Sequence, residues 1–190
     1  MSSGTHHATH ADTLAGRIEE ATGVKLAHCY QCGKCAAGCP VSDQMDLTPC
    51  QALRMLQYGF PELDRRVLQS EGIWLCLTCE TCSTRCPQEV EIPKVMDFLR
   101  SEAVRLDLAH PKSKDILAFH RAFLDSIEHT GRLYEVGLVA DYKMRSRHFL
   151  KDVMLAPKMY FKGKLGLFPH LIKNRQGMKA IFKRTTGKAT

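Results

Sequence analysis

Eight of the nine cysteines fall into two copies of one pattern, Cys-x-x-Cys-x-x-Cys-x-x-x-Cys-Pro. The first copy runs from Cys29 to Pro40, and the second runs from Cys76 to Pro87. Three cysteines at two-residue gaps allow one loop to place three thiolates around a cube of iron and sulfur, and soft thiolates are the ligands that such clusters take. The pattern therefore predicts two [4Fe–4S] clusters.

The last cysteine of each copy stands one residue further along and precedes a proline, which fixes the backbone and turns the chain out of the loop. In two-cluster ferredoxins this fourth cysteine serves the other cluster. We therefore expect crossed ligation of the iron, which would join the two motifs and bring the clusters close enough to exchange electrons. Cluster one would be held by Cys29, Cys32, Cys35 and Cys86, and cluster two by Cys76, Cys79, Cys82 and Cys39.

Zinc sites and disulfides are the other common fates of paired cysteines. Zinc needs four ligands, usually from two separated pairs, so two cysteines of each copy would be surplus. Disulfides need an oxidising compartment, whereas the N-terminus shows no signal peptide. No uncharged apolar run approaches the roughly 18 residues that span a bilayer. We therefore expect a cytoplasmic protein without a transmembrane segment.

Three further residues with reactive side chains are expected to be structural. Cys50 follows Thr48-Pro49 at the start of a helical stretch, where a small thiol is more typical of core packing than of ligation. His120 and His129 lie on a helical segment without an identified acidic or nucleophilic partner. The sequence therefore predicts no catalytic residue among them.

Helix signals dominate the remainder of the chain. Thr13 and Gly23 are suited to begin and end one short helix, and Thr48 and Gly59 are suited to begin and end another. Ferredoxins built from strands would show alternating patterns between the cysteine motifs, where this chain shows helical ones. The sequence thus predicts an all-α fold, an α-helical ferredoxin dicluster domain with a helical C-terminal extension.

Three more helices are expected outside these caps. One would run from Pro61 to Ser70 and stop at Gly72. Apolar residues at three- and four-residue spacing predict a longer helix from Glu91 to about Leu108, with Leu106 in its buried stripe, and another between Ser113 and Gly131. The resulting division of the chain is a flexible N-terminus with a short helix (1–27), the dicluster domain (28–110), a helical extension (111–142) and a C-terminal tail (143–190).

Charge separates this tail from the rest of the chain. Residues 1–142 carry a net charge of −5, whereas the basic tail, residues 143–190, carries +12. Its charges alternate with apolar side chains, which favours docking against a protein partner over binding of nucleic acid or of a membrane surface. A merely solvated basic face remains an alternative.

Motifs for substrate chemistry are missing from the sequence. We find no glycine-rich dinucleotide fingerprint, no Walker loop and no Gly-x-Ser-x-Gly elbow. The chain also lacks the Cys-Cys-Gly motif of iron–sulfur centres that reduce disulfides. These absences favour a carrier of electrons without catalytic residues of its own.

Several stretches closely resemble the C subunit of heterodisulfide reductase (HdrC). They are Cys-Tyr-Gln-Cys-Gly-Lys-Cys (29–35), Gly-Cys-Pro (38–40), Ala-Leu-Arg-Met (52–55), Ile-Trp-Leu-Cys-Leu-Thr-Cys-Glu-Thr-Cys (73–82) and Arg-Cys-Pro (85–87). The resemblance covers about residues 12–110. It implies a helical ferredoxin domain similar to that of succinate dehydrogenase iron–sulfur subunits.

The resemblance also implies partners and a direction of electron flow. Electrons would pass from an HdrA-like flavoprotein through this chain to an HdrB-like catalytic subunit that cleaves a disulfide, within a hetero-oligomeric oxidoreductase complex. The iron–sulfur subunit of another flavin oxidoreductase, of the succinate, fumarate or glycolate type, is the main alternative. A zinc-binding scaffold or nucleic-acid module is a remote one.

Residues next to the predicted ligands should tune the two clusters differently. Gly33 and Gly38 would allow close backbone approach, and Lys34 would place a positive charge beside cluster one. The second motif has Glu80 and Arg85 instead. We therefore expect cluster one to have the higher reduction potential.

Overall fold

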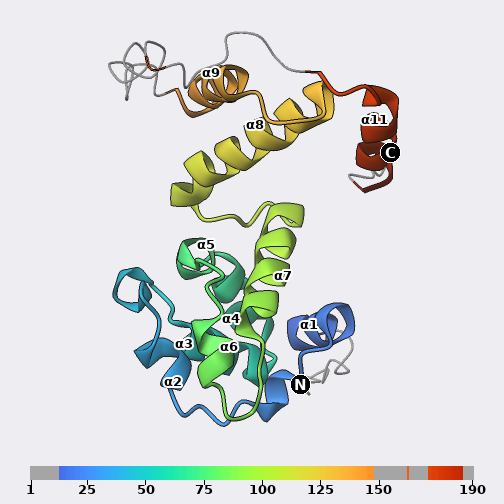
Figure 1. Cartoon of the computed structure of the whole chain (residues 1–190). Helices are drawn as coiled ribbons and strands as arrows, with labels where there is room; N and C mark the ends of the chain where they lie inside the picture. Colours follow the sequence, from blue (N-terminus) through green and yellow to red (C-terminus); the bar gives the residue numbers. More distant parts are fainter. Residues whose placement is uncertain (1–12, 148–161, 163–170, 186–190) are drawn as a thin grey trace, which may run out of the picture. The chain divides into compact units, whose positions relative to one another are not determined.

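The structure is a computed structural model that describes residues 13–147, 162 and 171–185. The chain divides into two compact units, residues 1–113 and 114–190. Every regular element of the described residues is a helix, which confirms the predicted all-α fold (Figure 1). The expected flexible segment before residue 13 and much of the basic tail lie outside the described residues.

The cysteine motifs both belong to the first unit, whose longest helix lies beside several shorter ones (Figure 1). Its α-helices are α1 (Leu14–Thr22), α2 (Lys34–Ala37), α3 (Pro49–Tyr58), α4 (Pro61–Leu68), α5 (Gly72–Leu75), α6 (Thr81–Arg85) and α7 (Ile92–Arg105). Single 3-10 turns are η2 (Leu26–His28), η3 (Ser42–Gln44) and η4 (Pro111–Ser113).

The predicted caps of α1 and α3 are confirmed. The Thr13 side chain accepts a hydrogen bond from the backbone of α1, and α1 ends at Gly23 in the left-handed conformation. In α3 the Thr48 side chain and that of Gln51 form a reciprocal capping box, and Gly59 ends the helix with a φ of 65°. These caps satisfy backbone groups that a helix end otherwise leaves unpaired.

The predicted end of the next helix is wrong. Helix α4 stops at Leu68, and Gly72 begins α5 instead of ending the preceding helix. The cause is Asp46, whose carboxylate accepts hydrogen bonds from the Ser70 hydroxyl at 2.6 Å and from the Gly72 backbone N–H at 2.7 Å. A Cβ on Gly72 would collide with the carbonyl oxygen of Leu47, so only glycine fits this junction.

Helix α7 forms the centre of the first unit and contacts α1, α4, α5 and α6. It ends at Arg105, short of the predicted Leu108, and Leu106 is 40% exposed, so its predicted burial is wrong. The remaining members of the predicted stripe are buried. The fully enclosed core side chains include Ile18, Leu53, Leu56, Val67, Val95, Met96 and Leu99.

A buried carboxylate connects α1 to α7. Glu102 is 6% exposed and accepts two hydrogen bonds of 2.7 Å from the guanidinium of Arg105. It also pairs with Arg17 of α1. The hydrogen bonds from Arg105, together with the charge of Arg17, hold the pKa of Glu102 below its usual value despite burial.

The described part of the second unit contains α8 (Lys114–Thr130), α9 (Glu135–Ser146) and α11 (Arg175–Thr185). The predicted helix between Ser113 and Gly131 is therefore confirmed. Helix α8 packs on α9, where the rings of Phe119 and Tyr142 meet edge to face at 6.0 Å. No helix in the described parts of either unit is long and apolar enough to cross a membrane.

Candidate iron–sulfur cluster site

The two cysteine loops share one backbone conformation. The second and fourth residues after the first cysteine are left-handed in both, with φ values of 65° at Gln31 and 74° at Gly33 in the first loop. In the second loop the values are 51° at Thr78 and 61° at Glu80. A short helix follows each loop, α2 in the first case and α6 in the second. The sequence repeat is thus a structural repeat.

The two glycines of the first motif serve different purposes. A Cβ added to Gly33 would meet no atom within 4 Å, so its positive φ, and not close approach, explains the glycine. A Cβ on Gly38 would collide with the side chain of Arg85. Arg85 therefore packs on the backbone of the first motif from the second one, which the sequence did not indicate.

One cavity brings a cysteine of the first motif to three of the second. Contacts between α2 and α6 place Cys39 beside the second loop. Cys39, Cys76, Cys79 and Cys82 all line the same space of about 360 Å³, part of which is open to solvent. Its walls also include apolar residues, among them Pro49 and Ile92. These are the four thiols expected for cluster two.

The first loop is in turn approached by the last cysteine of the second motif. Burial raises the pKa of Cys29, and the nearby thiols of Cys50, Cys86 and Cys32 raise it further. Cys35 is buried, which raises its pKa to about 12 with a further contribution from Cys50 and Cys29. Cys86 thus lies with the cysteines of the first loop, as crossed ligation requires, and Cys50 lies among them too.

The donor set fits a cluster better than a single ion. Among the described residues, no three Cys, His, Asp or Glu side chains converge closely enough to hold one metal ion. A zinc site draws four sulfurs to about 2.3 Å from one point, whereas a cube of iron and sulfur occupies the space between its ligands. Because burial keeps the Cys35 and Cys82 thiols protonated, cluster binding must displace their protons.

Two side chains from later helices fix the backbone at the first cysteine of each loop. In the first loop, the Gln57 amide of α3 donates to the carbonyl oxygens of Leu26 at 2.7 Å and of Cys29 at 2.8 Å. Sequence reasoning missed Gln57, because nothing in the local pattern shows which helix will cover a loop.

Arg100 of α7 does the same at the second loop. Its guanidinium donates to the carbonyl oxygen of Ile73 at 2.6 Å and to that of Cys76. Each loop is thus held at its first cysteine and at the residue three positions earlier. Arg100 was also missed by sequence reasoning, for the same reason as Gln57.

Three polar groups lie at hydrogen-bond distance from cysteine sulfurs. The Gln31 side-chain amide donates to Cys29, and the Val90 backbone N–H donates to Cys86, each over 3.4 Å. In the second loop the Thr81 hydroxyl lies 3.4 Å from the sulfur of Cys79. Such bonds stabilise a more negative sulfur and therefore a reduced cluster. Crossed ligation would give cluster one two of these three bonds.

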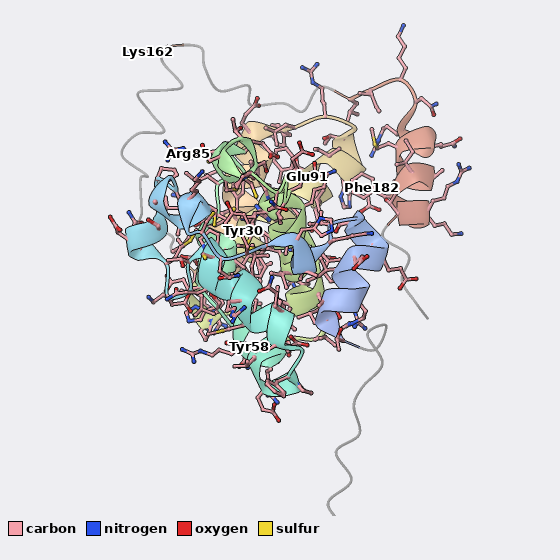
Figure 2. The ribbon with its side chains drawn as sticks, turned by 90° about the horizontal axis from the view of Figure 1, so that it is seen from below. Tyr30, Tyr58, Arg85, Glu91, Lys162 and Phe182 are labelled. Carbon is pink, nitrogen blue, oxygen red and sulfur yellow. The ribbon has the colours of Figure 1, made fainter. Side chains whose placement is uncertain are left out.

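Parts of both loops are open to solvent. Cys32 and Cys79 are exposed. The residue after each first cysteine is also exposed, Tyr30 by 58% (Figure 2) and Leu77 by 62%. Trp74, which precedes the second loop, is buried. A cluster in either loop would therefore have one edge near the surface, where a partner could exchange electrons with it.

Comparison with known proteins supports this arrangement. A family profile described as a 4Fe-4S dicluster domain matches residues 25–90, which include both cysteine motifs. Similar proteins include the C subunit of the H(2):CoB-CoM heterodisulfide,ferredoxin reductase of Methanothermobacter thermautotrophicus. That protein is 30% identical over 103 residues, which are 54% of this chain and 54% of the relative.

Two further relatives have corresponding names. The C 2 iron-sulfur subunit of the CoB--CoM heterodisulfide reductase of Methanocaldococcus jannaschii is 37% identical over 98 residues, half of each chain. The C subunit of the ferredoxin:CoB-CoM heterodisulfide reductase of Methanosarcina acetivorans is 34% identical over 123 residues, 65% of this chain and 45% of the relative. The chain thus spans about half the length of the relatives that it matches.

Proposed function

Because the chain is an HdrC-like protein with a 4Fe-4S dicluster domain, we propose that it relays electrons within a heterodisulfide reductase-type complex. The observation that carries this proposal is the cavity in which Cys39 of the first motif joins Cys76, Cys79 and Cys82 of the second. Two complete sets of four thiols in one unit suit a relay, because neighbouring clusters can pass electrons between them.

The proposed ligands are those that the spacing predicts. Cluster two is held by Cys76, Cys79, Cys82 and Cys39, and cluster one by Cys29, Cys32, Cys35 and Cys86. When bound, each cluster accepts and releases electrons one at a time. The chain's own side chains position the sulfurs, through Gln57 and Arg100, and limit access of water, through Trp74.

The proposed partners follow the names of the relatives, which are subunits of larger reductases. A flavin-bearing HdrA-like subunit would deliver electrons, and an HdrB-like subunit would reduce the disulfide. The exposed Tyr30 and Leu77 mark where such partners would approach the two loops. The basic tail is proposed to dock on a partner, in the cytoplasm, and its described helix α11 keeps Ile181 exposed among lysines and arginines.

Metal analysis under anaerobic conditions tests the proposal first. The purified chain should contain about eight iron and eight sulfide per molecule, the content of two [4Fe–4S] clusters. Zinc without sulfide would overturn the proposal. Co-purification with a flavoprotein and a second iron–sulfur subunit, identified by mass, would support the complex, and reduction of the chain by that flavoprotein would support the direction of flow.

Single ligand variants test the crossed ligation. Cys39→Ser should perturb the spectroscopic signal of the cluster that Cys76→Ser perturbs, and Cys86→Ser should perturb the signal that Cys29→Ser perturbs. The opposite pairing, with Cys39 grouped with Cys29, would show that each motif holds its own cluster.

A further inference from the structure

We propose that Gln31, held in one orientation by Gln57 and Cys50, raises the reduction potential of cluster one. This inference rests on the proposed function, because it assumes that Cys29 is a ligand of that cluster. It gives a role to Cys50, the one cysteine outside the two motifs. The four residues form a continuous chain of hydrogen bonds.

The orientation of the chain is set by Gln57. Its side-chain nitrogen faces the carbonyl oxygens of Leu26 and Cys29, which can only accept hydrogen bonds. That nitrogen must therefore be the NH₂ group, and the amide oxygen of Gln57 must point the other way. This oxygen lies 3.3 Å from the side-chain nitrogen of Gln31.

Gln31 is then fixed in turn. Because the Gln57 oxygen needs a donor, the NH₂ group of Gln31 faces it, and the same group lies 3.4 Å from the sulfur of Cys29. A primary amide has two N–H bonds, so it can serve both acceptors at once. The left-handed backbone of Gln31, with a φ of 65°, places its side chain over the loop in this position.

Cys50 completes the chain at its far end. The amide oxygen of Gln31 lies 3.1 Å from the sulfur of Cys50, and an oxygen acceptor there requires the thiol to donate its proton. Cys50 is half-buried at the first turn of α3, the helix that also carries Gln57. One helix thus grips both ends of the Gln31 amide, and the expectation that Cys50 only fills the core is incomplete.

The consequence is electrostatic. Reduction adds one negative charge to a cluster and its sulfurs, and an N–H aimed at a ligand sulfur stabilises that charge without having to reorganise. The second loop has Thr78 at the position of Gln31, and its short side chain is exposed. The amide is therefore a difference between two otherwise similar loops, and it should affect cluster one alone.

The test is a redox titration of the anaerobically purified full chain, followed by electron paramagnetic resonance. The signals are assigned beforehand with Cys29→Ser and Cys79→Ser. Gln31→Met keeps the length of the side chain and removes its donor, so the midpoint of cluster one should fall while that of cluster two stays. Gln69→Met, at the exposed end of α4, is the matched control and should shift neither midpoint.

Cys50 supplies a second pair of variants that leave the loop sequence intact. Cys50→Ala frees the Gln31 oxygen and should shift the midpoint of cluster one in the same direction by less, whereas Cys50→Ser retains a donor and should restore it. In heavy water, the deuteron coupling from the exchangeable amide to cluster one should disappear in Gln31→Met.

The outcomes separate this inference from the proposed function. Unchanged midpoints with both clusters present would overturn the role of Gln31 and leave the relay intact, as would equal shifts of both clusters. Loss of cluster one in Cys50→Ala with retention in Cys50→Ser would also overturn it, because Cys50 would then be needed for assembly. A wild-type chain without iron and sulfide would instead contradict the proposed function.

Discussion

The guanidinium of Arg100 donates a hydrogen bond to the carbonyl oxygen of Cys76, the first cysteine of the second loop. Gln57 makes the corresponding contact to Cys29 in the first loop. A loop that wraps a metal must present its sulfurs before the metal arrives, and these two side chains order the backbone at the point where each loop begins. Both come from helices whose buried faces belong to the hydrophobic core.

Replacing Arg100 should therefore damage cluster two more than cluster one. In Arg100→Met the carbonyl oxygens of Ile73 and Cys76 lose a charged donor whose side chain is only 20% exposed, which should cost about 2–3 kcal/mol of stability. Iron content and the signal of cluster two should fall. Arg66→Met, on the exposed side of α4, serves as the control. Equal loss of both clusters would point to general unfolding instead.

The left-handed positions of the loops predict opposite effects of two substitutions. Gly33→Ala has room for its Cβ but forces a side chain into a positive φ, which should cost about 1–2 kcal/mol. Glu80→Gly relieves the corresponding strain in the second loop and should stabilise it by a smaller amount, because glycine gains entropy in the unfolded chain. The denaturation midpoints of the loaded proteins measure both, and shifts of the same sign would contradict the shared conformation.

Glu102 should make stability depend on pH. Its folded pKa lies below the usual 4.5, so the unfolded chain binds more protons between the two values. The stabilisation is therefore complete above pH 4.5 and is lost as the pH falls through the folded pKa. Glu102→Gln should cost about 2 kcal/mol at pH 7.

The difference between Glu102→Gln and the wild type should shrink as the pH falls below 4.5. Asp64 works in the opposite direction, because burial raises its pKa and its protonation favours the folded state at low pH. It is present in both proteins and cancels from the comparison. Glu62→Gln, in the exposed first turn of α4, is the control. A gap that stays constant with pH would exclude titration of Glu102 as its source.

Removing the clusters should unfold the cysteine loops first. Helices α2 and α6 have four and five residues, too few to be stable without tertiary support. Chelation of iron under anaerobic conditions should expose their amides to hydrogen exchange, followed at peptide resolution by mass spectrometry. Amides of α8 and α9, in the other unit, should exchange as before. Unchanged protection in α2 and α6 would mean that the loops are preformed without iron.

Local signals predicted much of the fold. Thr48, Gln51 and Gly59 lie within one helix and its caps, so their roles could be inferred from a few neighbouring residues. The end of α4 could not, because Asp46 reaches across the chain to bind Ser70 and Gly72. Glycine has two uses, and the sequence alone did not distinguish a stop from a tight start.

The site shows the same limit. The spacing of the cysteines predicted which thiols belong together, and Cys39 does lie with the second motif. Gln57, Arg100 and the hydrogen bond of Cys50 depend on which helix covers which loop. No local pattern encodes that arrangement. The predicted order of the cluster potentials remains a prediction, and the sulfur contacts of Gln31 and Val90 agree with its direction.

The pairing of Cys39 with the second motif also bears on how the protein is made. With crossed ligation, the ribosome releases the first three thiols of cluster one long before their fourth partner, Cys86, has been synthesised. Cluster two is complete only when Cys82 has emerged. The two sites therefore become available almost together, late in translation, and insertion of either cluster before that point would leave iron with an open coordination position on a nascent chain.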